Sequence, residues 1–138
     1  RMKTLCNIRV VLFQVVCCVA LALPLHAAAQ QKNGAHLEFE CAECDLGEIS
    51  RNDERLNHTF TFVNNGTEPL VILSATTTCS CLKAEFSRKP IEVGAKGEIK
   101  ISIEPKKIEK GVFRRVVQIR SNSVSGTDII TIKGVSKE

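Results

Sequence analysis

The sequence predicts an all-β protein, a sandwich of about seven antiparallel strands preceded by a cleavable signal peptide. Apolar and polar residues alternate with a period of two in several short segments, and turn-forming residues separate those segments. No window shows the 3.6-residue period of an amphipathic helix. The segments recur at about the 8–12-residue spacing that is typical of a sandwich. The 138 residues suit a single domain.

The first 29 residues predict an export signal. Three basic residues lie at its start, an almost uncharged apolar run follows from Val10 to Leu25, and three alanines end it at Ala29. The run is shorter than the roughly 20 apolar residues of a membrane-spanning helix, and Pro24 interrupts it. We therefore expect cleavage after Ala29, no transmembrane segment after cleavage, and an exported protein in the periplasm or the extracellular space.

Removing the signal changes the charge balance. The whole chain carries a formal net charge of +4, but three of its positive charges lie in residues 1–29, which hold no acidic residue. The remaining part carries +1, which does not indicate a nucleic-acid-binding protein. Residues 30–36 are polar and are expected to form a flexible leader. Residues 37–138 are expected to form the domain, which is long enough for one modest core.

The strands follow from the alternation, in chain order. They are expected around residues 58–63, 70–72, 82–86, 99–103, 117–119 and 130–132. Turn residues separate them at 64–69, 94–97, 111 and 121–126. Two facing sheets would then bury one side of each strand. The expected core is Phe60, Phe62, Ile72, Ile99, Ile101, Ile103, Val117, Ile119, Ile130 and Ile132.

The run from Phe60 to Leu70 resembles the "F.F.N.G..PL" signature of the bacterial domain-of-unknown-function 1573 family. Further motifs agree with that family in order: Cys79-Ser80-Cys81, the turn at 90–94, the strand at 97–105, Gly111, Phe113, Ser121-Asn122 and residues 132–134. The family is related to the Hydin-like and major-sperm-protein-like immunoglobulin folds. The resemblance, over residues 37–135, therefore implies an immunoglobulin-like sandwich in the cell envelope. It implies little about activity.

Three departures from the family pattern concern the cysteine motifs. Ser80 replaces the usual glycine and Leu82 the usual threonine, while Cys41 and Cys44 are additions. Four cysteines remain after signal cleavage, and an even number in an exported chain favours disulfides. Sequence alone cannot choose among the three possible pairings. A bridge between Cys79 and Cys81 would close a tight ring, so we expect two disulfides that join the early pair to the central pair.

Metal binding is the alternative use of these cysteines. Cys41, Cys44, Cys79 and Cys81 could form a tetrahedral thiolate site for zinc or copper, with His58 as a further ligand. Against this, Cys-x-Cys is not a usual spacing for structural zinc. A half-buried strand position is the simpler explanation of His58. We expect no cofactor, with zinc or copper as the alternative.

No catalytic constellation is found in the sequence. There is no GxSxG motif, and Cys41-x-x-Cys44 lies among strands and acidic residues, which should raise a thiol pKa rather than lower it. A basic cluster could contact an anionic surface or simply be a solvated loop and a protected edge strand: Lys106, Lys107, Lys110, Arg114 and Arg115. We expect a non-enzymatic binding or structural module of the envelope, whose partner is another envelope or extracellular protein.

Overall fold

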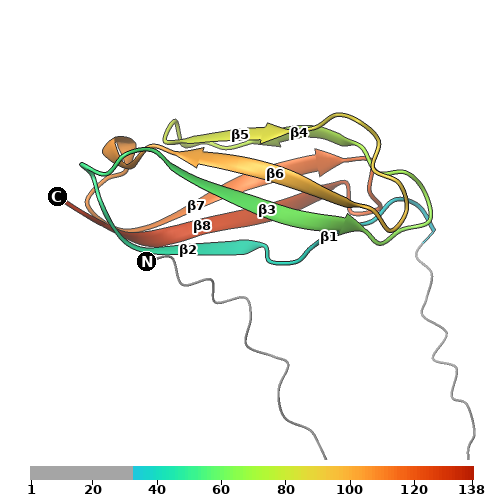
Figure 1. The fold of residues 1–138 in the computed structure, drawn as a ribbon, viewed down its shortest axis with the longest axis horizontal. Helices are drawn as coiled ribbons and strands as arrows, with labels where there is room; N and C mark the ends of the chain where they lie inside the picture. The colour runs from blue at the N-terminus through green and yellow to red at the C-terminus, as the bar shows by residue number, and fades with distance from the viewer. Residues whose placement is uncertain (1–32) are drawn as a thin grey trace, which may run out of the picture.

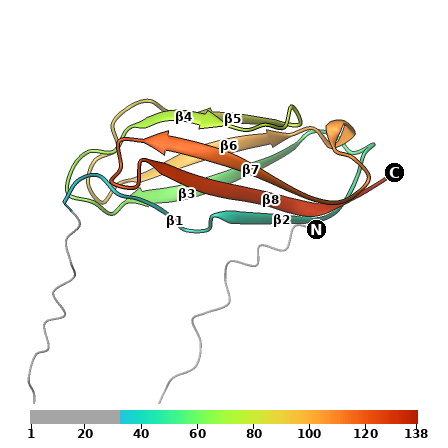
Figure 2. The same cartoon turned by 180° about the vertical axis from the view of Figure 1, so that it is seen from behind.

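The computed structural model describes residues 33–138 as a sandwich of two four-stranded sheets (Figures 1 and 2). Sheet I has the order β1-β3-β6-β5, with β1 at Leu37–Phe39, β3 at Leu56–Asn64, β6 at Lys96–Ile103 and β5 at Leu82–Phe86. Sheet II has the order β2-β8-β7-β4, with β2 at Glu43–Ser50, β8 at Thr127–Lys137, β7 at Gly111–Ser121 and β4 at Ile72–Thr76. A short 3₁₀-helix, η1, spans Pro105–Lys107. This confirms the immunoglobulin-like sandwich.

The predicted signal peptide and the first residues of the predicted leader lie outside the described residues. Within residues 33–138, no helix has the length and apolar character needed to cross a membrane.

The core contains all ten residues that the alternation placed there, each no more than 1% exposed. They come from both sheets, so each sheet buries one face against the other, as the period of two requires. Leu70 and Ile108 extend the core at the two ends of the sandwich.

The strand count and one pairing differ from expectation. Residues 33–138 form eight strands, and β2 runs parallel to β8, whereas the sequence suggested about seven that are all antiparallel. The buried residues of β2 are Cys44, Leu46 and Ile49, so their spacing changes from two to three. A bulge between Asp45 and Glu48 causes this change, and Gly47 supplies its positive φ of 65°.

The folded domain begins earlier than residue 37. Ala35 is only 2% exposed and bridges to Ser123, and the Gly34 N–H donates to Thr67 Oγ1 over 2.9 Å. The last residues of the predicted flexible leader therefore pack against the sandwich. A single small apolar residue among polar ones has no periodicity, which is why the sequence pattern did not reveal it.

The signature from Phe60 to Leu70 comprises the end of β3 and the turn that follows it, which Asn64 organises. Asn64 is fully buried, and its Oδ1 accepts hydrogen bonds from the N–H groups of His36 (3.3 Å) and Gly66 (3.1 Å). Its Nδ2 donates to the carbonyls of Glu68 (2.7 Å) and Ile91 (3.0 Å). A Cβ at Gly66 would collide with the backbone of residues 34–36. This motif therefore joins the β3–β4 turn to the chain that precedes β1.

Candidate functional site

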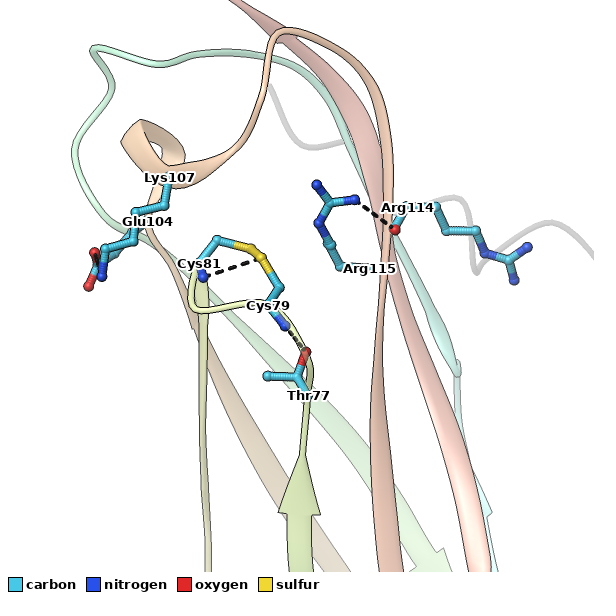
Figure 3. Close-up of a disulfide and its surroundings, with 7 residues drawn as sticks. All are labelled: Thr77, Cys79, Cys81, Glu104, Lys107, Arg114 and Arg115. Atoms are coloured by element: carbon cyan, nitrogen blue, oxygen red, sulfur yellow. Dashed lines mark hydrogen bonds and ion pairs between the residues drawn. A yellow bond between two sulfur atoms is a disulfide. The ribbon is translucent and has the colours of Figure 1, made fainter.

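The four cysteines do not gather at one rim as expected. Cys79 and Cys81, in the loop between β4 and β5, are joined to each other by a disulfide with a Cα–Cα distance of 5.1 Å (Figure 3). Cys44 lies on β2, which is separated from β4 by β8 and β7. Three strand spacings place these strands about 14 Å apart, whereas a disulfide needs Cα atoms within about 7 Å. The expected pairing of Cys44 with the central cysteines is therefore wrong.

The Cys79–Cys81 disulfide contributes little to stability through loop closure. In the chain-entropy model, a three-residue loop contributes roughly 1.6 kcal/mol, against about 4 kcal/mol for a loop of roughly 38 residues such as the expected cross-links. Backbone hydrogen bonds hold the loop independently of the sulfurs. The Leu82 N–H donates to the Cys79 carbonyl over 3.2 Å, and the Glu104 N–H donates to the Cys81 carbonyl over 2.9 Å.

The two sulfurs of this disulfide have different surroundings. Cys81 is 1% exposed and belongs to the core, whereas Cys79 is only partly buried and is followed by the exposed Ser80. The Cys81 N–H donates to Cys79 Sγ over 3.3 Å, and the Cys79 N–H donates to Thr77 Oγ1, also over 3.3 Å. Cys79 is therefore the more exposed of the two bonded cysteines, although it also packs against the core.

Charged residues lie on two sides of the disulfide loop. Because Thr76 of β4 pairs with Gln118 of β7, continuing this register past β4 brings Cys79 toward the backbone of Arg115, whose guanidinium donates a hydrogen bond to the Arg114 carbonyl over 3.2 Å (Figure 3). On the other side, Glu104 pairs with Lys107 over 2.7 Å and with Arg55 over 2.8 Å. These two cations lower the pKa of Glu104, with the hydrogen bond from Lys107 as the largest cause.

The other cysteines have different environments. Cys44 is a buried free thiol, and burial, followed by the charge of Asp45, raises its pKa to about 11. It is therefore a poor nucleophile at neutral pH. Cys41 precedes β2, and its Sγ lies 3.0 Å from the Glu43 carbonyl oxygen.

The residues proposed as metal ligands are not brought together. Across residues 33–138, no group of three or more His, Cys, Asp or Glu side chains is placed to hold a metal ion. His58 lies on β3 opposite Ile101, and its ring contacts the edge of Phe60 at a centroid distance of 4.7 Å. Burial lowers the pKa of His58. Its position agrees with its interpretation as a half-buried strand residue.

The five residues of the predicted basic cluster lie in different surroundings. Lys107 and Lys110 are occupied by ion pairs with Glu104 and Glu138, both 2.7 Å long. Lys106 lies on η1, and its carbonyl accepts a hydrogen bond from Arg51 over 3.1 Å. Arg114 lies on the outer face of β7, whereas the half-buried Arg115 has the phase of the core residues. These five residues therefore do not form one continuous basic patch.

Four exposed apolar residues, which the sequence pattern did not reveal, lie among polar and charged residues on the outer face of sheet II. We call this group the apolar face and define it by Leu73 (49% exposed), Val112 (87%), Val116 (41%) and Ile129 (52%). The half-buried Val135 lies opposite Val112 in the β7–β8 register and continues it. Because β7 also has apolar residues on its inner face, its sequence does not alternate strictly, and the sequence alone did not show that these valines are exposed.

Sheet I has no counterpart to the apolar face. Within the described chain, the two other exposed large apolar residues, Val93 and Val124, lie in loops. The outer positions of sheet I are mostly polar or charged: Asn57, Thr59, Thr61, Lys83, Glu85, Lys96, Glu98 and Lys100. The two outer faces of the sandwich therefore differ in chemistry.

Charges and a hollow border the apolar face. Arg114 and Arg120 alternate with Val112 and Val116 along the outer side of β7, and neither arginine has an ion-pair partner within residues 33–138. On β8, by contrast, Lys133 is paired with a glutamate of β2. A hollow of about 320 Å³ lies where β2, β7 and β8 meet, lined by residues that include Val112, Val135, Lys133, Asp45 and Glu48.

Comparisons with known proteins show similarity of fold. A protein of unknown function from Porphyromonas gingivalis W83 has 20% identity and a TM-score of 0.63, over 81% of this chain and 51% of its own. The secreted serine protease VesC from Vibrio cholerae has 17% identity and a TM-score of 0.56, over 78% of this chain and 23% of its own. This chain thus spans about half, or less, of the length of these two proteins.

A separate domain shares the fold over nearly its full length. The ASH/PapD-like domain 7 of human CEP192 has 13% identity and a TM-score of 0.54, over 91% of this chain and 99% of its own. No curated protein sequence matches this chain. The sequence model of a family of proteins of unknown function, DUF1573, matches residues 37–136, which include all of the strands described above except the last residue of β8. The chain therefore belongs to the DUF1573 family.

Proposed function

We propose that this domain is a non-enzymatic binding module of an exported cell-envelope protein, and that it binds another protein through the apolar face. The contrast between the two outer faces of the sandwich carries this proposal. Exposed apolar residues scattered singly are ordinary, whereas here four of them share the outer face of one sheet, with polar and charged residues between them. Val112, Val116 and Ile129 lie on two neighbouring paired strands, so a single partner can cover all three.

Charge defines the chemistry of the partner. Arg114 and Arg120 flank Val116 on β7 without ion pairs within the described chain, while Lys133 is neutralised by Glu43. A partner that covers this face therefore needs carboxylates spaced between apolar side chains. We propose that the partner is an acidic, partly apolar protein segment, because burial of apolar surface and ion pairs with the two arginines would both favour its binding. An envelope location agrees with the predicted signal peptide and with the similar domain in a secreted protease.

We expect Val116→Asp to lower the affinity for the partner at least about tenfold, because it places an unpaired carboxylate in the centre of the interface. The measurement is capture from an envelope extract by the immobilised wild-type chain, followed by titration of the captured protein. Arg114→Glu should weaken binding as well, and the loss should grow smaller as salt is added.

Thr61→Asp is the matched control, because Thr61 occupies a central strand on the outer face of sheet I. It should leave binding unchanged. Equal capture by the wild type and all three variants would show that the apolar face is not the interface. The proposal would also be contradicted if the wild type captured no protein beyond those that Val116→Asp captures.

A further inference from the structure

We propose that the Cys79–Cys81 disulfide is a site of thiol–disulfide exchange. In this site Cys79 forms the mixed disulfide with a thiol of another molecule, and Cys81 is the resolving cysteine. This property is independent of protein binding at the apolar face. It follows from the unequal exposure of the two sulfurs, the groups that surround them and the minor structural contribution of their bond.

The exposure of the two sulfurs determines where an attack can occur. An attacking thiolate must approach one sulfur from the side opposite the other, so the attacked sulfur has to be accessible. Cys81 is 1% exposed within the core, whereas Cys79 is partly exposed beside the surface residue Ser80. Cys79 is therefore the cysteine that a thiol from outside the protein would attack.

The surroundings also favour a negative charge on Cys79 in the reduced form. The Cys81 N–H donates to Cys79 Sγ over 3.3 Å, and the β4–β7 register places Arg115 on the strand next to the Cys79 loop, where its guanidinium donates to the Arg114 carbonyl (Figure 3). Both a hydrogen-bond donor and a cation stabilise a thiolate relative to a thiol. The carboxylate nearby, Glu104, is already neutralised by Lys107 and Arg55. Cys79 is therefore suited to act as the nucleophile in the reverse direction.

The exchange is balanced in two steps. A thiolate RS⁻ attacks Cys79 Sγ, an R–S–Sγ bond forms, the Cys79–Cys81 bond breaks, and its electron pair leaves on Cys81, which takes a proton from water. A second thiolate RS⁻ then attacks the R sulfur of the mixed disulfide, which releases RSSR and leaves a thiolate on Cys79. The two thiols are oxidised to a disulfide, and the protein disulfide is reduced to a dithiol.

The fold tolerates this reaction. The loop keeps its backbone hydrogen bonds from Leu82 to Cys79 and from Glu104 to Cys81, neither of which involves a sulfur. Closing a three-residue loop also removes little entropy from the unfolded chain. A disulfide whose loss leaves the domain folded can cycle between its two states.

The test uses Cys81→Ser, which leaves Cys79 without its resolving partner, and oxidised glutathione as the probe. We expect Cys79 to take up one glutathione at least about tenfold faster than Cys81 does in the matched variant Cys79→Ser. Tryptic cleavage after Arg55 and Lys83 gives a peptide whose only cysteines are Cys79 and Cys81, so mass spectrometry assigns the adduct directly. Equal rates in the two variants would overturn the assignment of roles.

A second measurement uses the wild-type protein, which avoids any folding defect of the variants. Reduced glutathione should open the disulfide, detected by alkylation of the same tryptic peptide, while the circular dichroism spectrum stays unchanged. If Cys79 and Cys81 become alkylated only when the spectrum is lost, the bond is structural and the proposal fails. Arg115→Gln should slow glutathione uptake in the Cys81→Ser background, and an unchanged rate would remove Arg115 from the site.

Discussion

Replacing Asn64 with leucine is expected to lower the free energy of unfolding by about 3–5 kcal/mol. Leucine keeps the approximate size of the side chain but removes all four of its hydrogen bonds. The Gly66 N–H and the Glu68 carbonyl then lose partners in a partly buried turn, and each unsatisfied buried group costs about 1–3 kcal/mol. The Ile91 carbonyl loses less, because it also accepts from the Leu70 N–H over 2.9 Å.

Urea unfolding followed by circular dichroism measures this effect, with Asn65→Ala as the matched control. Asn65 is the next residue in the same turn, but its side chain is exposed and bonds only to Glu38, over 2.7 Å. The control should change stability by no more than about 0.5 kcal/mol. Similar losses of stability in both variants would show that Asn64 has no special role in organising the turn.

The strands that could be predicted from sequence are those in which apolar and polar residues alternate strictly, because successive side chains of a pleated strand point to opposite faces. Ile99, Ile101 and Ile103 alternate with exposed residues, so their phase was readable without a structure. β2 was not readable, because the bulge at Gly47 shifts its buried residues by one position and breaks the period. β1 has only three residues, too few to establish a period.

The candidate sites depend on topology, which local patterns do not encode. The cysteine pairing was mispredicted because β8 and β7, which come last in the chain, lie between β2 and β4 in sheet II. The turn at 64–69 correctly indicated a reversal but not which sheet each strand enters. The apolar face was missed for a related reason. The sequence analysis assigned Val112 and Val116 to neither face, and only the structure shows that they lie on the exposed face of β7.

The signature residues shared with the family have a structural role at one end of the sandwich. Asn64, Gly66 and Leu70 all serve the turn between β3 and β4, and the chain before β1 packs on them. The features that can distinguish a function are instead at the opposite end and on the outer face of sheet II. There lie the apolar face and the disulfide loop, whose Cys79-Ser80-Cys81 motif also resembles the family but is separate from the run at Phe60–Leu70.

Ile101→Ala is expected to lower the free energy of unfolding by about 2–5 kcal/mol. Ile101 is fully buried on β6, where it is paired with His58 of β3 on one side and Ala84 of β5 on the other. Truncation loses the transfer free energy of three carbon atoms and leaves a cavity. Its neighbours in sheet I are held by their own strand pairings, so the cavity can collapse only partly, and the upper half of this range is expected.

Lys100→Ala is the control, because Lys100 is adjacent in sequence but exposed on the outer face of the same strand. Its loss should stay within about 0.5 kcal/mol, since the structure gives its side chain no ion pair within residues 33–138. Chemical denaturation of both variants decides the point. Equal destabilisation would mean that β6 presents the other face to the core, and because β6 is central to sheet I, the phase of β3 and β5 would then be wrong as well.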